Sequence, residues 1–311
     1  MTFLNFLFPP DDPLSDILKK ISTVAECNHK RVFLVGGVVR DRLLGIDTKD
    51  IDISVIGNGI EFAHKLAKSL KVDNVIEYPR FGTAMIPYHD KLIEVATARM
   101  EEYETSSRKP QIIESSLRDD LARRDFTINA MALSLNRENY LELTDYFEGL
   151  KDLNAGIIRT PLDPITTFSE DPLRMLRAVR FATQLNFRIE PNTFKAIERV
   201  RERIKIISQE RITDELTKIL KVPEEPSRGF ELLKESTLLD LILPEIAALD
   251  GVDQRNGYHH KDVFKHTLQV LDNIAQVSSK FELRLTALLH DIAKPLTKQF
   301  FPDKGWTFYG H

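Results

Sequence analysis

The segment from Asp50 to Ile56 alternates strictly between polar and apolar residues, and this pattern limits the possible folds more than any other in the chain. Alternation with a period of two is typical of a β-strand that buries one face. Asp50 and Asp52 both belong to the polar face, so the strand presents two carboxylates on one side. Taken alone, such a pair is most often a solvated strand face. The alternative is a metal site, because Mg²⁺ prefers oxygen ligands of this kind.

A turn of two glycines before this strand favours the metal site. Arg31–Val35 is predicted to be a strand that runs into Gly36 and Gly37, and Val38–Leu44 is predicted to be a helix. Backbone N–H groups at such a turn, with the positive end of a helix dipole, suit the phosphates of a nucleoside triphosphate. Arg40 adds a charged donor in the first helical turn. The combination is far more specific than either motif alone.

Glu94 offers a third carboxylate. It lies in a predicted strand, Leu92–Thr97, that pairs with Ala84–Pro87 through a turn. Three carboxylates at one place suit two metal ions about 4 Å apart, which activate an attacking hydroxyl and stabilise a leaving pyrophosphate. The chemistry needs mainly positioning and charge neutralisation.

The rest of the chain divides into a mixed N-terminal part and a helical C-terminal part. Helical spacing covers 14–28 and Glu61–Leu70. Arg99–Asp119 is charged and aperiodic, which predicts a mobile loop. Helical patterns dominate from Leu117 onward, apart from a short stretch near Ile157–Arg159. The predicted fold class is therefore α+β, with a small head (a mixed β-sheet and flanking helices) followed by an all-helical neck and body. The predicted boundaries give an N-terminal helical segment (1–28), the head (29–155), the neck (156–225) and a C-terminal helical domain (226–311).

The composition excludes several classes of protein. A single cysteine, Cys27, excludes a disulfide framework and a Cys-rich zinc module, and it suits a reducing cytoplasm. No apolar run is long enough to span a bilayer, and residues 1–10 lack the features of a signal peptide. The net charge of −4 means that any basic surface for nucleic acid must be local. We expect a cytoplasmic protein without membrane contact, and the sequence predicts no oligomeric state.

Several motifs occur together in a fixed order. They read Leu34-Val-Gly-Gly-Val-Val-Arg-Asp-Arg-Leu-Leu-Gly45, Asp50-Ile-Asp52, Arg123-Arg-Asp-Phe-Thr-Ile-Asn-Ala-Met-Ala132, Asp145-Tyr-Phe-Glu-Gly-Leu-Lys-Asp-Leu153 and Glu170-Asp-Pro-Leu-Arg-Met-Leu-Arg-Ala-Val-Arg-Phe-Ala182. Over roughly residues 30–225 this set resembles the class II tRNA nucleotidyltransferases (the CCA-adding enzymes) and the bacterial poly(A) polymerases. Chance agreement over this length is not a serious alternative.

The resemblance implies a role for each matching residue of the head. Two carboxylates would ligate two Mg²⁺ ions beside a third carboxylate, the Gly-Gly-Arg turn would contact the phosphates, and the Arg-Arg-Asp segment would contact the nucleotide and its sugar. The implied metal ligands are Asp50 and Asp52 with Glu94, and the implied nucleotide-binding residues of the head are Gly36, Gly37, Arg40, Arg124, Asp125 and Asn129.

A second group of matching residues opens a predicted helix, with Asp171 suited to the N-cap and Pro172 to the first helical position. Arg174, Arg177 and Arg180 then recur every three residues. Such a stripe is either a solvated basic face or a surface that meets phosphates or carboxylates. The resemblance implies that Asp171 and Arg174 pair with the edge of the incoming base. Cytosine and adenine both carry an amino group, and an Asp can accept a hydrogen bond from it. Uracil and guanine present a carbonyl at that place, and such a mismatch costs on the order of 1–3 kcal/mol.

A locally basic segment follows, with Glu198 and Glu202 among its cations. It suits the tRNA backbone and a solvated helix face about equally. The cations are Lys195, Arg199, Arg201, Arg203 and Lys205.

The C-terminal region contains His266 and the dipeptide His290-Asp291, and it resembles HD-domain phosphohydrolases. Imidazoles and a carboxylate can bind a divalent transition metal. The resemblance places a final Asp well downstream, and the chain ends at His311, so we expect 226–311 to be the start of a truncated HD-type domain. The alternative is a helical domain whose histidines are structural.

These features predict a CCA-adding enzyme that acts on tRNA with CTP and ATP. The nearest alternatives are a poly(A) polymerase and a partial enzyme that adds only CC or only A. Alternatives from another class are an HD-type phosphohydrolase and an RNA-binding protein with an inactive head. The intact metal and phosphate residues, including Asp50 and Arg124, argue against an inactive head.

Overall fold

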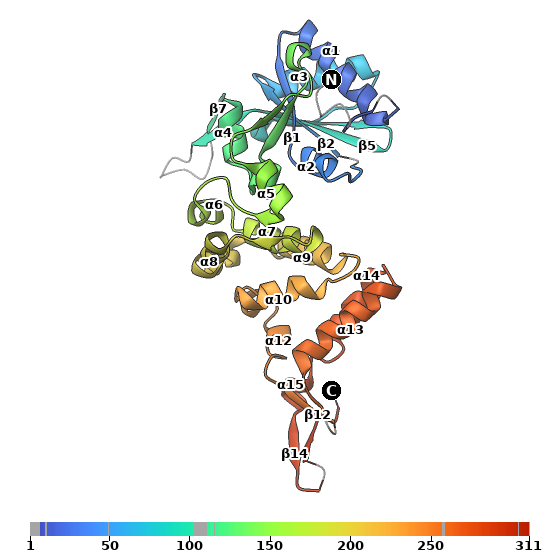
Figure 1. Ribbon diagram of the computed structural model, residues 1–311, viewed down its shortest axis with the longest axis vertical. Helices are drawn as coiled ribbons and strands as arrows, with labels where there is room; N and C mark the ends of the chain where they lie inside the picture. The colour runs from blue at the N-terminus through green and yellow to red at the C-terminus, as the bar shows by residue number, and fades with distance from the viewer. Residues whose placement is uncertain are drawn as a thin grey trace. The chain divides into compact units, whose positions relative to one another are not determined.

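The computed structural model describes residues 7–9, 11–48, 50–102, 111–114, 116–256, 259–303 and 305–310. The chain forms two compact units (Figure 1). The first, here called the head unit, contains Met1–Ala155 and Arg159–Leu162. The second, the helical unit, contains Gly156–Ile158 and Asp163–His311. Among the helices of the described residues, none combines the length and apolar character that a membrane crossing requires.

The head unit is built on a seven-stranded mixed sheet with the order β3-β4-β5-β2-β1-β8-β9. β2 and β5 run parallel, and the other neighbours run antiparallel. The strands that alternate or are rich in β-branched residues occupy their predicted positions. The strands are β1 (Arg31–Val35), β2 (Asp50–Ile56), β3 (Ile76–Tyr78), β4 (Thr83–Tyr88), β5 (Lys91–Thr97), β8 (Met131–Ser134) and β9 (Leu143–Asp145).

Helices α1 and α3 contact each other and cover one face of this sheet (Figure 1). Asp12 caps α1 by accepting a hydrogen bond from the amide of Leu14, and Pro13 is the first helical residue. The apolar side of β2 points to this layer and is fully buried. The helices of the head unit are α1 (Pro13–Cys27), α2 (Gly37–Leu43), α3 (Gly59–Leu70), α4 (Leu117–Ala122) and α5 (Gly149–Ala155).

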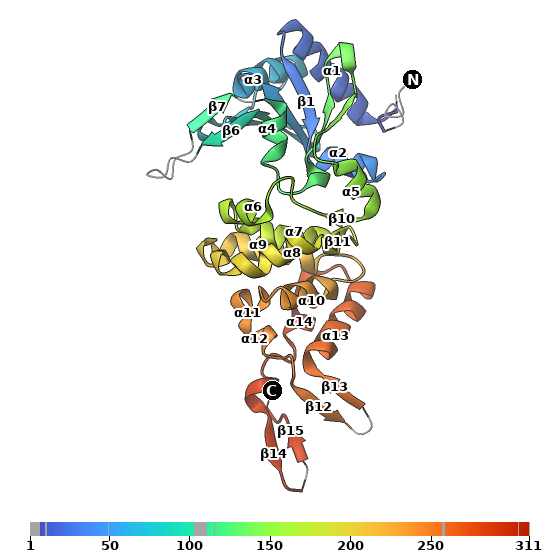
Figure 2. The ribbon, with the colours of Figure 1, turned by 60° about the vertical axis from the view of Figure 1, so that its left-hand side comes forward.

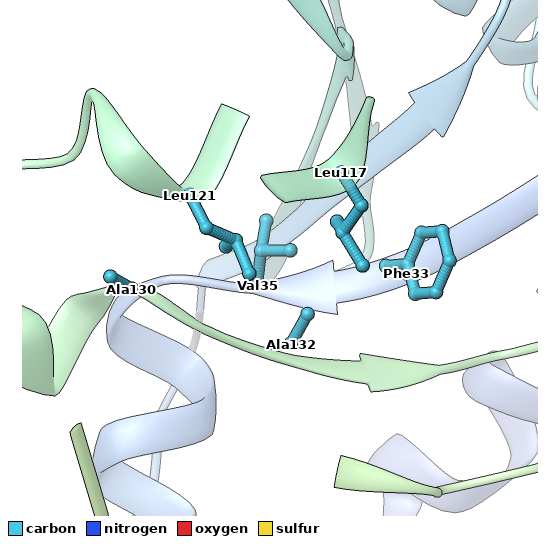
Figure 3. Packing of buried hydrophobic residues seen from close by; sticks show 6 residues of the cluster. All are labelled: Phe33, Val35, Leu117, Leu121, Ala130 and Ala132. Atoms are coloured by element: carbon cyan, nitrogen blue, oxygen red, sulfur yellow. The ribbon is translucent and has the colours of Figure 1, made fainter. Parts of the chain in front are cut away.

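Helix α4 packs on the opposite face, which carries Asp52 and Ser54. Its two leucines lie against β1 and the start of β8 (Figure 3). Burying side chains of this size stabilises the fold by about 1.5–3 kcal/mol each, which fixes α4 on the sheet. The polar residues of α4 and those just after it are thereby held beside the polar side of β2. The cluster consists of Phe33, Val35, Leu117, Leu121, Ala130 and Ala132.

The expectation of an aperiodic loop over Arg99–Asp119 was wrong for the described residues. β6 (Arg99–Glu102) and β7 (Gln111–Glu114) pair as an antiparallel hairpin, and α4 begins with a capping box at Ser116 (Figure 2). Residues 103–110 and 115 lie outside the described residues. Strands of four residues rich in charge are too short for alternation to be recognised.

The expectation of helical structure from Leu117 onward was also wrong within the head. β8 and β9 are strands, and β8 pairs with β1 inside the sheet. All four residues of Met131–Ser134 are buried. A strand that is buried on both sides shows no alternation, so its pattern does not differ from that of a short buried helix.

The helical unit is mainly helical, which together with the mixed head sheet confirms the predicted α+β class (Figure 2). It is not all-helical, because short strand pairs occur at β10–β11, β12–β13 and β14–β15. Its helices are α6 (Pro164–Glu170), α7 (Leu173–Gln184), α8 (Pro191–Val200), η5 (Arg201–Ile206), α9 (Gln209–Leu220), α10 (Ser227–Glu235), α11 (Leu239–Ile242), α12 (Pro244–Ala247), α13 (Val263–Val277), α14 (Phe281–Leu289) and α15 (Lys294–Thr297). Its strands are β10 (Ile157–Ile158), β11 (Arg188–Ile189), β12 (Asp253–Asn256), β13 (His259–Asp262), β14 (Gln299–Phe301) and β15 (Gly305–Thr307).

A buried arginine ties α9, α13 and α14 together. Arg284 of α14 is 2% exposed, and burial lowers its pKa. Its guanidinium donates to the carbonyl oxygens of Leu220, Val222 and Ala275 at 2.7, 2.5 and 3.1 Å. These bonds offset the desolvation of the cation and satisfy carbonyls at the end of α9 that have no partner within the helix.

Candidate active site

The three predicted carboxylates lie on neighbouring strands of the head unit. β2 and β5 pair in parallel with Asp52 opposite Glu94 and Asp50 opposite Leu92. Cross-strand partners point to the same side of a sheet, so Asp52 and Glu94 share one face. Asp50 lies one strand period before Asp52 on that face. Asp50 is exposed, whereas Asp52 and Glu94 are half-buried.

These carboxylates perturb one another's protonation. Burial, followed by Glu94 and Asp50, raises the pKa of Asp52 from 3.8 to about 6, although Arg124 and Arg40 act in the opposite direction. Burial also raises the pKa of Glu94, against the effect of Arg124. The negative charge of the three carboxylates therefore exceeds the positive charge that Arg40 and Arg124 supply. A divalent cation would supply the missing positive charge, so the residues present fit such a metal.

Gly36 allows Arg124 to approach Asp52. Its φ of +77° and ψ of −142° belong to a region that essentially only glycine adopts. A Cβ atom at this position would lie 2.8 Å from Nη1 of Arg124 and 3.1 Å from Oδ2 of Asp52. A side chain would therefore push the guanidinium away from the carboxylates. At Gly37 the nearest atom would be Nη2 of Arg40 at 3.5 Å, which is an ordinary contact.

Arg40, Asn129 and Asp125 form a buried hydrogen-bonded chain. Nη1 of Arg40 donates to Oδ1 of Asn129 at 2.7 Å, and Nδ2 of Asn129 donates to Oδ1 of Asp125 at 2.9 Å. Arg40 also pairs with Asp41 at 2.7 Å. The segment is a single 3-10 turn, η3 (Thr127–Asn129), and not an α-helix, yet it still brings Asp125 and Asn129 together. The guanidinium of Arg40, which was predicted to contact phosphates, is engaged inside the protein and is 5% exposed.

Two residues of this site, Asp120 and Ser54, were missed by the sequence analysis. Asp120 of α4 is 2% exposed, and its carboxylate accepts from Ser54 Oγ at 3.3 Å, Arg123 Nη2 at 3.2 Å and Arg124 Nη2 at 3.4 Å. Two signals were available in the sequence. Ser54 is the third polar residue of the alternating strand, and Asp120 precedes Arg124 by one helical turn.

In the helical unit, the predicted base-recognition residues lie where α7 begins. α7 begins at Leu173 with Pro172 as its N-cap, one residue later than predicted. Asp171 is the C-cap of α6, and its Oδ1 accepts from the amide of Leu173 at 3.2 Å. Its Oδ2 lies 3.4 Å from Nη2 of Arg211 in α9. Nη1 of Arg174 lies 3.9 Å from a carboxylate oxygen of Glu170. Asp171 and Arg174 are both half-buried and remain partly open to solvent.

The arginine stripe of α7 divides into an exposed and a buried part. Arg174 and Arg177 are half-buried, whereas Arg180 is 8% exposed. Nε of Arg180 donates to Oε2 of Glu215 in α9 at 2.6 Å, and its Cζ lies 3.9 Å from the ring centroid of Phe181. Arg180 therefore pairs with a carboxylate of the protein itself, and this ion pair helps to pack α7 against α9.

The basic segment lies on α8 and η5. Lys205 pairs with Glu202 at 2.6 Å, and both side chains are exposed. Arg201 donates to the backbone carbonyl of Glu198 at 2.7 Å. Glu202 thus takes up part of this positive charge.

A second cluster of metal-ligating side chains lies in the helical unit, where His266, His290 and Asp291 each offer a ligand atom within 4.8 Å of the others. Nε2 of the two histidines lies 3.8 and 3.2 Å from Oδ2 of Asp291. Nδ1 of His290 lies 2.8 Å from the carbonyl of Ala287, which orients the ring. Nζ of Lys294 also lies 2.7 Å from Asp291. No other trio of potential ligands among the described residues is this tight, so the head carboxylates are more widely spaced.

Three family models match consecutive parts of the chain. The model described as "Poly A polymerase head domain" matches residues 32–159. The model described as "Probable RNA and SrmB- binding site of polymerase A" matches residues 186–249. The model described as "HD domain" matches residues 263–311.

Known proteins that are similar to this chain include tRNA nucleotidyltransferases. An A-adding tRNA nucleotidyltransferase of Aquifex aeolicus is 49% identical over 168 residues, which is 54% of this chain and 20% of that protein. A multifunctional CCA protein of Chromobacterium violaceum is 36% identical over 276 residues, which is 86% of this chain and 63% of that protein. A solved tRNA nucleotidyltransferase, complexed with a primer tRNA and an incoming ATP analogue, is 36% identical with a TM-score of 0.69. That match covers 87% of this chain and 75% of the solved one. The chain thus spans less than two thirds of both curated relatives.

Proposed function

The chain belongs to the family of tRNA nucleotidyltransferases and poly(A) polymerases, and from this premise we propose that it is a CCA-adding enzyme. It would add C, C and A to the 3′ end of tRNA from CTP and ATP, without a nucleic-acid template. The observation that carries the proposal is that the carboxylates of Asp50, Asp52 and Glu94 lie on neighbouring parallel strands, with Arg124 beside them in the space that Gly36 leaves open. Relatives that act on tRNA support the choice of substrate.

Asp50 and Asp52 would hold two Mg²⁺ ions, with Glu94 as a further carboxylate. Bound there, the ions would lower the barrier to attack of the tRNA 3′-hydroxyl on the α-phosphate and to departure of pyrophosphate. Arg124 would bind the nucleotide's phosphates, because its guanidinium faces this group without forming an ion pair to it in the described structure. Asp125 would hold the sugar in an orientation set by its bond to Asn129.

Asp171 and Arg174 would select the base. A carboxylate accepts a hydrogen bond from the amino group of cytosine or adenine. In uracil or guanine it would face a carbonyl oxygen, which is also an acceptor, so no hydrogen bond could form. Nη2 of Arg211 in α9 lies 3.4 Å from the same carboxylate. Arg177 lies on the same partly exposed side of α7, whereas the buried Arg180 would support the helix.

Addition of A alone is the second candidate, because one relative with 49% identity is an A-adding enzyme. A poly(A) polymerase shares the same head. The segment expected to distinguish partial enzymes, Arg99–Asp119, includes residues 103–110, which lie outside the described part of the chain.

One experiment separates these activities. The protein is incubated with labelled CTP or ATP and three RNAs: tRNA ending before CCA, tRNA ending after CC, and an unrelated RNA. CC followed by A on the first tRNA supports the proposal, A on the second tRNA alone supports the A-adding enzyme, and long A tails on any RNA support the polymerase. Asp50→Ala should reduce incorporation about a thousandfold. Asp47→Ala, which removes a fully exposed carboxylate nearby, should leave it within about twofold. Full activity of Asp50→Ala would overturn the mechanism.

A phosphohydrolase activity in the helical unit is supported by the trio His266, His290 and Asp291. These residues would hold a divalent transition metal, since imidazole nitrogens and one carboxylate suit such ions. Calorimetric titration with Mn²⁺ or Co²⁺ should show a site that His266→Ala weakens at least tenfold. Equal metal affinity of the wild type and His266→Ala would indicate that the histidines have a structural role.

A cytoplasmic location would suit tRNA and nucleotide substrates, and it is consistent with Cys27, which is exposed and forms no disulfide.

A further inference from the structure

Asp120 is a buried carboxylate that contacts no metal-binding residue directly. It is 2% exposed, and a buried charge of this kind needs partners to offset its desolvation. Its Oδ1 accepts from Nε and Nη2 of Arg123 at 3.3 and 3.2 Å. Its Oδ2 accepts from Ser54 Oγ at 3.3 Å and from Arg124 Nη2 at 3.4 Å. One carboxylate oxygen of Asp120 therefore links Ser54 of β2 to Arg124.

The position of Arg124 depends on which carboxylate it pairs with. Its charge acts to lower the pKa of Asp52 and of Glu94, so both carboxylates attract it. Among the carboxylates that the structure describes, however, only Asp120 lies within ion-pair distance of Arg124. Its other terminal nitrogen, Nη1, faces Gly36 and Asp52. Asp120 thus holds one side of the guanidinium and leaves the other side available.

Ser54 fixes Asp120 in turn. It lies on β2 two residues after Asp52 and points to the same face, opposite Phe33 of β1. Ser54 is 1% exposed, so its hydroxyl has little access to water as an alternative partner. Helix α4 is held on this face by Leu117 and Leu121. The chain Ser54–Asp120–Arg124 therefore transmits the position of the strand to the guanidinium.

We propose that Asp120 is a positioning residue for nucleotide binding, which keeps Arg124 from collapsing onto Asp52 and Glu94 and aims it at the phosphates of the incoming nucleotide. This rests on the proposed function, in which Arg124 binds those phosphates. Without this restraint, the four rotatable bonds of Arg124 would have to be ordered when the nucleotide binds. The guanidinium would also be attracted to Asp52 and Glu94. Both effects weaken the affinity for the nucleotide.

The test compares Asp120→Asn, Arg124→Lys and the double variant. Asn keeps the size and a hydrogen-bond acceptor for Ser54 but loses the charge that holds Arg124. We expect Asp120→Asn to raise the KM for CTP and ATP about tenfold and to leave the KM for tRNA within about twofold. The double variant should be no worse than Arg124→Lys alone, because both changes act on one interaction. A purely structural Asp120 would instead raise the two KM values alike and add its effect to that of Arg124→Lys.

Asp119→Asn is the matched control, since it changes a carboxylate of the same helix that caps α4 and does not contact Arg124. It should lower the melting temperature without changing the KM for nucleotides. If Asp120→Asn does not fold, Ser54→Ala tests the same chain, with an expected threefold rise or so in nucleotide KM that Arg124→Lys abolishes. A wild-type nucleotide KM in the folded variant, Asp120→Asn or Ser54→Ala, would overturn the proposal.

The same variants separate this proposal from the proposed function. If the wild-type protein adds no nucleotide to tRNA, CTP and ATP binding is measured by calorimetry instead. A tenfold weaker affinity of Asp120→Asn, absent in the Arg124→Lys background, then supports positioning although the activity assignment fails. Equal affinities for wild type and Asp120→Asn overturn positioning whatever the activity is.

Discussion

At the scale of single residues, Gly36 and Gly45 show how close approach differs from backbone freedom. Both have positive φ angles, +77° and +72°. A Cβ at Gly36 would meet Arg124 and Asp52, whereas one at Gly45 would meet nothing within 4 Å. A glycine is therefore needed at Gly36 for two reasons: its φ and ψ suit only glycine, and a guanidinium and a carboxylate occupy the space of a side chain.

We expect Gly36→Ala to lower nucleotide incorporation at least about tenfold, because the added methyl displaces Arg124 from the phosphate-binding position. Gly45→Ala, at a second glycine with a positive φ, should keep activity within about twofold, because no atom lies within 4 Å of the added methyl. Steady-state incorporation of CTP and ATP measures both. Equal losses in the two variants would show that backbone strain alone is responsible.

The raised pKa of Asp52 gives a prediction about stability. In the metal-free protein the folded state holds this proton up to a pKa of about 6, above the ordinary value of 3.8. The folded state therefore binds more protons than the unfolded chain between these values, and stability falls as the pH rises through them. We expect Asp52→Asn to raise the free energy of unfolding at pH 8 by on the order of 2 kcal/mol and to change it little at pH 4. Denaturant unfolding in EDTA measures this, and a gain of the same size at both pH values would contradict it.

At the scale of elements, the arginines of α7 illustrate how one periodic stripe serves two purposes. Arg174 and Arg177 face the side that remains partly open to solvent. Arg180 is buried against Glu215 of α9, and Lys218 adds a second cation to that carboxylate at 2.9 Å. Burial alone would raise the pKa of Glu215, but Arg180 and Lys218 outweigh it and lower the pKa. At pH values above the ordinary pKa of Glu, the pair therefore stabilises the packing of α7 on α9. This contribution is lost as the pH falls through the lowered pKa of Glu215.

We expect Arg180→Met to destabilise the protein by about 3 kcal/mol at pH 7, because it leaves Glu215 buried with only an exposed partner. Arg177→Met should change stability by less than about 0.5 kcal/mol, since Arg177 is partly exposed. Denaturant unfolding at pH 7 compares the two variants. A similar loss in both would mean that Arg180 has no special role in packing.

At the scale of the whole molecule, the two candidate metal centres belong to separate compact units. The carboxylate group lies in the head unit, and the trio of His266, His290 and Asp291 lies in the helical unit. The ligand types also differ, because oxygen ligands suit Mg²⁺ and imidazoles suit transition metals. If the proposed function is correct, the two centres would therefore act independently.

This independence is testable with one pair of variants. Asp50→Ala should abolish nucleotide incorporation and leave hydrolysis of 2′,3′-cyclic or 2′-phosphorylated substrates within about twofold. His266→Ala should do the reverse. Both activities are measured on the same preparations, with Mn²⁺ and Mg²⁺ compared. Loss of both activities in either variant would show that the two centres depend on each other.

Local sequence determined much of the head. Alternation predicted β2 at its residues, the β-branched run before the glycine turn predicted β1, and apolar spacing predicted α1. These features depend on side-chain periodicity and on the backbone preferences of a few residues, which act over short distances. The motif order was also sufficient to indicate the family, and with it the residues that would carry the chemistry.

Tertiary structure alone decided three things. β8 is buried on both sides, so only its pairing with β1 distinguishes it from a helix. The parallel register of β2 and β5 set Glu94 opposite Asp52 and made a group of separate carboxylates. The packing of helices on distant segments brought Asp120 of α4 to Ser54 and Glu215 of α9 to Arg180. In each case the partner is distant in sequence, and desolvation makes a buried charge depend on which partner the fold supplies.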